Sequence, residues 1–160
     1  MINYLSLKIL KFFDSYKQSR LINFLKKDKK FFNVFFDIGA HHGESIKLFL
    51  TNFKINKIYS FEPVESNFDV LKNNKNLINK KFKDTEIVIE NFALGSEKKK
   101  IKIKELKETS SSTFNEININ SKYFKKKKFY LDTLDNENFF LEKEVQVHTL
   151  SDYLDKMNIR

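Results

Sequence analysis

The spacing of apolar residues changes near residue 30. Before this point, apolar side chains such as Leu5, Ile9 and Phe12 recur at the spacing of one helix face, with lysines between them. After it, short runs rich in aromatic and β-branched residues alternate with stretches of helical spacing. We therefore expect an N-terminal amphipathic helical segment over residues 1–30 and a folded domain over residues 31–160.

The alternation within the second region predicts a parallel α/β sheet. A strand, helix, strand, helix, strand order with short connections is typical of such sheets. Pro63 is expected to open the second helix, at a position where its missing N–H costs nothing. Phe68, Leu71 and Leu77 are expected to form the buried side of that helix. The expected strands are Phe32–Asp37, Lys57–Phe61 and Thr85–Glu90, and the expected first helix is Glu44–Phe53.

The stretch VFFDIGAHHGES joins the first expected strand to the first expected helix. The chain has 3 glycines and 1 proline among 160 residues, well below the roughly 7% and 5% of ordinary proteins, so we infer that its glycines have backbone roles. Gly39 is expected to begin a tight turn, and Gly43 to let the helix start close to the strand. Parallel sheets bind ligands at the carboxyl ends of their strands, which makes this turn a candidate ligand site.

The charges around the turn favour one class of ligand. The dinucleotide fingerprint fails, because His41 and Glu44 stand where its second and third glycines would be. Asp37 and Glu44 flank the turn, and their carboxylates would repel a pyrophosphate but attract sulfonium and ammonium groups. The sequence therefore favours S-adenosylmethionine over NAD as the cofactor.

Two further segments add to the same expected site. Glu62 ends the second strand, near the distance along the chain at which an acidic residue meets ribose hydroxyls in nucleotide-binding sheets. After the third strand, Asn91 and Phe92 could present an amide and an aromatic face to adenine. Gly95 follows in the segment ENFALGSE, and we expect all three glycines and Pro63 at the mouth of one crevice.

In the order FDIGAHHGES, YSFEPVESNFDVLKNN, IENFALGSEKKKIKI, SSST and VQVHTLSDYL, the chain resembles the FkbM family of S-adenosylmethionine-dependent methyltransferases. The resemblance runs from about Phe32 to about Lys156. It implies a Rossmann-like class I methyltransferase sheet with flanking helices, and methyl transfer to an oxygen of a sugar, glycolipid or polyketide-like acceptor. By position, it implies that Asp37, Gly39 and Gly43 hold the methionine part of the cofactor, Glu62 the ribose, and Asn91 and Ala93 the adenine region. Ala40, Pro63 and Phe92 complete the expected cofactor-binding set.

The family continues into a further central strand after the segment VQVHTLSDYL, whereas this chain ends at Arg160. We therefore expect residues 31–160 to be the N-terminal portion of a methyltransferase domain, incomplete because the central fourth strand is missing. The edge exposed on the first strand would favour self-association. An alternative reading of the chain is a non-catalytic S-adenosylmethionine-binding fragment. No catalytic residue or general base is assigned.

Charge and composition leave other partners open. A net charge of +9 suits nucleic acid, but the chain has only two arginines, Arg20 and Arg160, so a basic nucleic-acid-binding module is the less favoured alternative. The N-terminal helix is too short and too charged to span a membrane, although it could contact a membrane surface. With no cysteine, the chain suits a reducing compartment, and we expect a cytoplasmic location.

The remaining polar residues are weaker candidates. His41, Ser111 and Ser112 are candidate contacts of the methyl acceptor, the serines because the resemblance places a serine-rich loop there. His41 and His42 have no evident third ligand in the sequence, so we expect no metal. His148 lies in an alternating strand and is expected to face solvent.

Overall fold

The computed structural model describes residues 18–106, 112–113, 121–122 and 140–159. The chain divides into two units, Met1–Asp28 with Lys104–Glu142 and Lys29–Ile103 with Lys143–Arg160. In the first unit, residues 18–28 form a helix. Leu5, Ile9 and Phe12, on which the amphipathic helix was predicted, lie outside the described residues, and the boundary at residue 30 stays a prediction. No helix of the described part is both long and apolar enough to cross a membrane.

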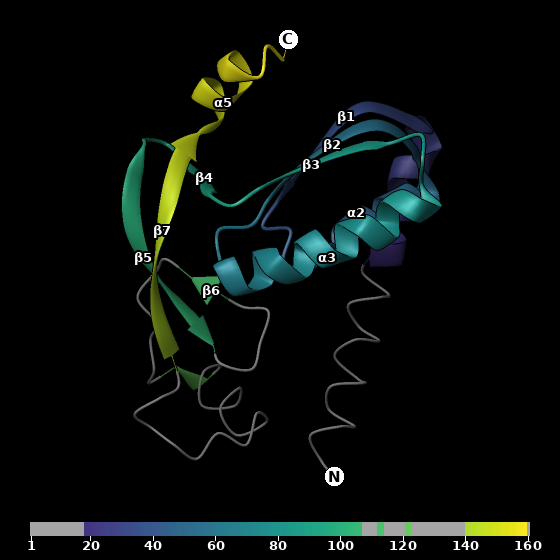
Figure 1. Cartoon of the computed structure of the whole chain (residues 1–160). Helices are drawn as coiled ribbons and strands as arrows, with labels where there is room; N and C mark the ends of the chain where they lie inside the picture. The colour runs from purple at the N-terminus through teal and green to yellow at the C-terminus, as the bar shows by residue number, and fades with distance from the viewer. Residues whose placement is uncertain (1–17, 107–111, 114–120, 123–139, 160) are drawn as a thin grey trace. The chain divides into compact units, whose positions relative to one another are not determined.

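The second unit contains the expected parallel sheet. Its strands are β1 (Phe31–Ile38), β2 (Lys54–Phe61) and β3 (Glu86–Glu90), in the order β1-β2-β3 (Figure 1). Phe36 pairs with Tyr59, which in turn pairs with Val88. Within the described residues, β1 pairs with β2 on one side only. The prediction of an α/β fold with a parallel sheet is confirmed, with strand boundaries that differ by up to three residues.

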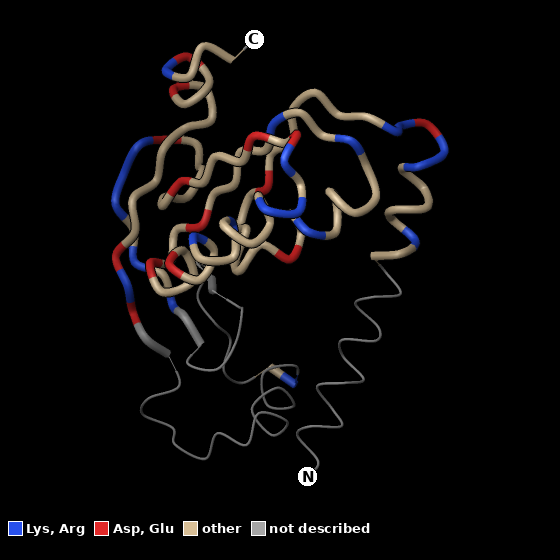
Figure 2. The backbone as a smooth tube through the Cα atoms, turned by 45° about the vertical axis from the view of Figure 1, so that its right-hand side comes forward, with Lys and Arg blue, Asp and Glu red and all other residues tan. Residues whose placement is uncertain are grey.

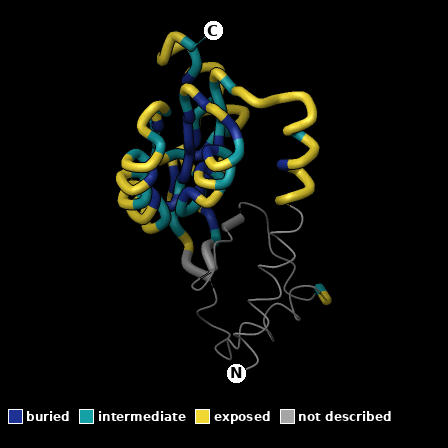
Figure 3. The backbone as a smooth tube through the Cα atoms, turned by 90° about the vertical axis from the view of Figure 1, so that its right-hand side faces the viewer, coloured by how far each residue is buried: buried dark blue, intermediate teal, exposed yellow. Residues whose placement is uncertain are grey.

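Helices α2 (Glu44–Asn52) and α3 (Glu65–Lys81) pack on one face of this sheet. Side chains alternate between the two faces along a strand. Phe35 stacks on Phe49 of α2, with ring centroids 4.3 Å apart, whereas its neighbour Phe36 stacks on Tyr59. Phe36 therefore belongs to the opposite face. Figure 3 shows that buried and half-buried residues dominate the strands, while the outer sides of the helices are exposed.

The start and the buried side of α3 differ from the prediction. The helix begins at Glu65 with Val64 as its N-cap, so Pro63 precedes the helix instead of opening it. The cause is local, because Val64 is extended and donates its N–H to the preceding Glu62 carboxylate, 2.9 Å away. Leu77 is 60% exposed, and Ile78 is buried in its place.

The second unit also carries strands of a second sheet and a short helix. The second sheet has the order β4-β7-β5-β6, in which β4 and β7 are parallel. Val147 of β7 is buried, and His148 is half-buried against the ring of Phe92 instead of facing solvent as predicted. A Cβ atom on Gly95 would lie 2.6 Å from Val147 Cγ1, which gives this glycine a packing role between strands in place of the expected ligand-facing one. The bounds are β4 (Ala93–Gly95), β5 (Lys99–Leu106), β6 (Ser112–Thr113), β7 (Phe140–Thr149) and α5 (Leu150–Lys156).

Helix α5 covers the face of the first sheet opposite α2 and α3. Its first turn is capped by the Thr149 hydroxyl, which accepts the backbone N–H of Asp152 at 3.0 Å. Tyr153 then packs edge-on against Tyr59 and Phe61 and is buried with them. The sheet is therefore covered on both faces, as expected for a parallel sheet. Basic residues are spread over several helices and strands of the described chain (Figure 2).

Candidate functional site

The turn after β1 is tied to the end of β2. The backbone N–H groups of Gly39 and Ala40 both donate to the carbonyl oxygen of Phe61, at 2.9 and 3.0 Å. Gly39 and Gly43 have φ angles of 82° and 89°, in the left-handed region that favours glycine. A Cβ atom on Gly39 would meet nothing within 4 Å, whereas one on Gly43 would lie 3.0 Å from Leu71 Cδ1. Gly43 thus lets α2 begin against α3, and Gly39 leaves open space beside the turn.

Glu62 joins the ends of β1, β2 and β3. Its side chain is only 4% exposed. Oε2 accepts the backbone N–H of His41 at 2.8 Å, and Oε1 accepts that of Val64 at 2.9 Å. The Glu62 backbone donates to the carbonyl of Glu90, and its own carbonyl accepts from the Asn91 side chain at 2.8 Å. Glu62 therefore organises the carboxyl edge of the sheet, which sequence reasoning did not foresee.

Asp37 is a buried carboxylate with an unused acceptor. It is the next-to-last residue of β1, is 7% exposed, and its Oδ2 atom has no hydrogen-bond partner in the described protein. Burial raises the pKa of Asp37 from the usual 3.8 to about 6, against the effect of a hydrogen bond with Ser45. The nearby carboxylates of Glu44 and Glu62 raise this pKa further. In the part of the chain that the structure describes, no lysine or arginine forms a salt bridge with Asp37 that would lower this pKa.

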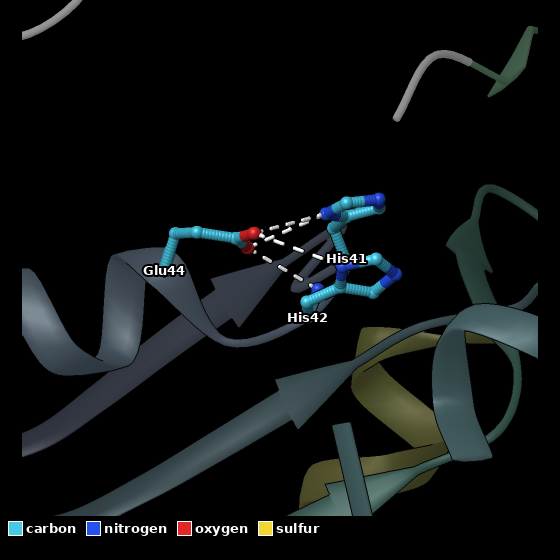
Figure 4. A group of neighbouring side chains, drawn as sticks. All are labelled: His41, His42 and Glu44. Atoms are coloured by element: carbon cyan, nitrogen blue, oxygen red, sulfur yellow. Dashed lines mark hydrogen bonds and ion pairs between the residues drawn. The ribbon is translucent and has the colours of Figure 1, made fainter. Parts of the chain in front are cut away.

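His41, His42 and Glu44 form a cluster at the start of α2 (Figure 4). His41 Nδ1 lies 3.3 Å from both carboxylate oxygens of Glu44, and the two imidazole rings stack with centroids 3.6 Å apart. Burial works to raise the pKa of Glu44, but a backbone hydrogen bond and the two histidines outweigh it and lower the pKa. Glu44, in the first turn of the helix, is therefore a third potential ligand beside the two histidines, and the prediction that they lack one is wrong.

The segment after β3 carries the residues expected near adenine. The Phe92 ring lies against Phe61, His148 and Tyr153, with centroids 5.5, 4.4 and 5.8 Å away. The Tyr153 hydroxyl donates to Glu90 Oε1 at 3.1 Å, and its burial beside this carboxylate raises the pKa of Tyr153 well above its usual range. Sequence reasoning missed both Tyr153 and Glu90. Of the two, only Tyr153 has a signal in the sequence, which is the apolar spacing of the last helix.

The expected cofactor residues come from the ends of the three parallel strands. Ser111 lies outside the described residues, and Ser112 belongs to β6 in the other unit, so the structure does not position either serine relative to these strand ends.

A cavity of about 560 Å³ lies at the opposite edge of the first sheet, where β1 and β2 begin, and is lined by Phe31 and Lys54 among others. None of the expected site residues lines it. The residues gathered at the carboxyl edge are Asp37, Gly39, Ala40, His41, Gly43, Glu62, Pro63, Asn91, Phe92 and Ala93.

Comparison with known proteins gives one family. Residues 37–160 match the model of the methyltransferase FkbM domain. No curated protein matches the chain. Among solved structures, the chain is similar to the methyltransferase FkbM from Methylobacillus flagellatus KT, with 14% sequence identity and a TM-score of 0.44, over 75% of this chain and 22% of that one. The chain thus spans about a fifth of the length of that protein.

Proposed function

The chain belongs to the FkbM methyltransferase family, and from this premise we propose that it binds S-adenosylmethionine at the carboxyl edge of β1, β2 and β3. The methyl group would be transferred to an oxygen of a sugar, glycolipid or polyketide-like acceptor. When bound, the cofactor supplies an electrophilic methyl group on a positively charged sulfonium. The residues at this edge bind and orient it.

The observation that carries the proposal is the unpartnered Oδ2 atom of the buried Asp37 carboxylate. A buried carboxylate oxygen without a hydrogen-bond donor is costly, and an ammonium group would satisfy Oδ2 and favour the ionised form. Glu44 and Glu62 add negative charge to the same turn, which disfavours a pyrophosphate. Gly39 contributes the open space through which a ligand can approach the backbone. The residues therefore fit a cationic amino acid better than a dinucleotide.

Glu62 has a double role in this proposal. Each of its carboxylate oxygens already accepts one backbone N–H, but each has a second lone pair. These remaining lone pairs would accept the ribose hydroxyls. The hydrogen bonds from His41 and Val64 hold the carboxylate in place before the ligand arrives. Asn91, Phe92 and Ala93 would form the adenine end of the site.

The residues of the chain contribute to the reaction mainly by positioning the reacting groups. Alignment of an acceptor oxygen with the methyl carbon and the departing sulfur can lower the barrier by several kcal/mol. His41 stands at the turn and is a candidate for contact with the acceptor, as are Ser111 and Ser112. A general base for the acceptor hydroxyl is not assigned to any residue.

Calorimetric titration with S-adenosylmethionine tests the proposal. Asp37→Asn keeps the shape of the side chain and removes its charge, and it should weaken binding about tenfold or more through loss of a charge-assisted hydrogen bond. Asp69→Asn is the matched control, because Asp69 is exposed on α3, and it should bind as the parent does. Equal affinity of the parent and Asp37→Asn, or preferential binding of NAD, would show that the cofactor assignment is wrong.

A further inference from the structure

The side chains of His41, His42 and Glu44 present three potential metal ligands to one point. Their ligand atoms all lie within 4.8 Å of one another. His41 Nδ1 is 3.3 Å from Glu44 Oε1, and His42 Nδ1 is 3.9 Å from the same oxygen. Figure 4 shows the two rings one above the other, with the Glu44 carboxylate on one side of both.

These separations are close to those of a coordination sphere. Ligands about 2.0–2.1 Å from a tetrahedral zinc ion are roughly 3.3–3.4 Å apart. The His41–Glu44 distance already has this value, and the His42–Glu44 distance exceeds it by about 0.5 Å. Three ligands would leave a fourth position open, as in catalytic rather than structural zinc sites.

The backbone under the two histidines is anchored independently of any ligand. His41 has a φ of 47°, and its N–H donates to Glu62 Oε2 at 2.8 Å. The carbonyl of His42 accepts from the Asn74 side chain at 2.9 Å, which attaches the turn to α3. The loop therefore holds the backbone of both histidines in place before a metal binds.

The local charge also suits a cation. The N-terminus of α2 carries a partial positive charge, which disfavours a bound cation. The carboxylates of Asp37, Glu44 and Glu62, which interact across this turn, oppose this effect with their negative charge. In the described part of the chain, no lysine or arginine forms a salt bridge with any of the three.

We propose that His41, His42 and Glu44 form a binding site for a divalent transition metal of the zinc type. Two imidazoles and one carboxylate favour zinc, cobalt or nickel over magnesium and calcium, which prefer oxygen ligands. The site lies in the same turn as the proposed cofactor site, but its existence does not depend on methyl transfer. Its test therefore needs no methyl donor.

The first experiment titrates the metal-free chain with Zn²⁺ in a calorimeter and with Co²⁺ while recording visible absorption. One equivalent should bind, and the cobalt complex should show the stronger bands of a four- or five-coordinate site. His42→Ala and Glu44→Gln should each weaken binding about tenfold or more. His148→Gln, which removes the remaining histidine of the chain, is the control and should bind as the parent does. Mg²⁺ should not compete.

A second measurement on the unaltered chain keeps the test independent of folding of the variants. Zn²⁺ should shift the imidazole nitrogen resonances of His41 and His42, with Nδ1 as the bound atom, and leave those of His148 unchanged. Absence of stoichiometric Zn²⁺ binding, equal affinity in well-folded His42→Ala, or a shift at His148 alone would overturn the proposal.

Discussion

Replacing Asp37 by asparagine should stabilise the fold while it weakens cofactor binding. The pKa of Asp37 is raised from 3.8 to about 6 because the side chain is buried and faces other carboxylates. The folded chain therefore binds this proton more tightly than the unfolded chain does. The contribution of Asp37 to the free energy of unfolding is fully present below about pH 4 and is lost as the pH rises through about 6.

The size of the effect follows from the two pKa values. A tenfold change in an ionisation constant is about 1.4 kcal/mol, so the ionised Asp37 costs up to about 3 kcal/mol at neutral pH. Asparagine does not titrate and keeps an oxygen for the Ser45 hydrogen bond. Asp37→Asn should therefore match the parent near pH 4 and melt about 6–12 °C higher near pH 7.

Thermal melts of both proteins across this pH range are the assay. Asp69→Asn, on the exposed surface of α3, should show no pH-dependent difference from the parent. If Asp37→Asn and the parent differed by the same amount at pH 4 and pH 7, Asp37 would not carry the raised pKa, and the reasoning from its burial would fail.

Three further substitutions test the packing around the site by urea unfolding. Glu62→Gln should cost about 1–3 kcal/mol, because the amide NH₂ would face a backbone N–H that the carboxylate now accepts. Gly43→Ala should cost about 1–2 kcal/mol, because of its left-handed φ and the 3.0 Å approach of Leu71 Cδ1. Gly95→Ala should cost about 1–3 kcal/mol, and Val147→Ala should relieve much of that cost by removing the clashing methyl group. An unfolding free energy unchanged from the parent in any of the three would contradict the corresponding contact.

Local patterns were sufficient to predict the first sheet and its helices. The apolar runs of β1, β2 and β3 are short and bounded by polar residues, and this alone indicates buried strands. The errors in the predicted boundaries come from contacts that form only in the folded structure. Pro63 would fit the first turn of a helix, but the Glu62 carboxylate fixes Val64 in an extended conformation and delays the helix.

The candidate site was predicted in part. The types and order of Asp37, Gly39 and Glu62 indicate a cationic ligand at a strand end, and the structure brings all three to one edge. The sequence does not show that Glu62 also binds two backbone N–H groups, or that the Tyr153 hydroxyl meets Glu90, 63 residues away along the chain. Such contacts depend on the packing of separate elements, for which a single sequence has no periodic signal.

The central claim is that S-adenosylmethionine binds at the carboxyl edge of β1, β2 and β3. The most direct test is an NMR titration of the isotope-labelled chain with this cofactor, which follows each backbone amide. The amides of Gly39, Ala40 and Asn91 should shift in a saturable way, while those of Lys54 and Asp84, at the cavity on the opposite edge, should not. Saturable shifts at Lys54 and Asp84 with none at Gly39 and Ala40, or no shifts at all, would contradict the assignment.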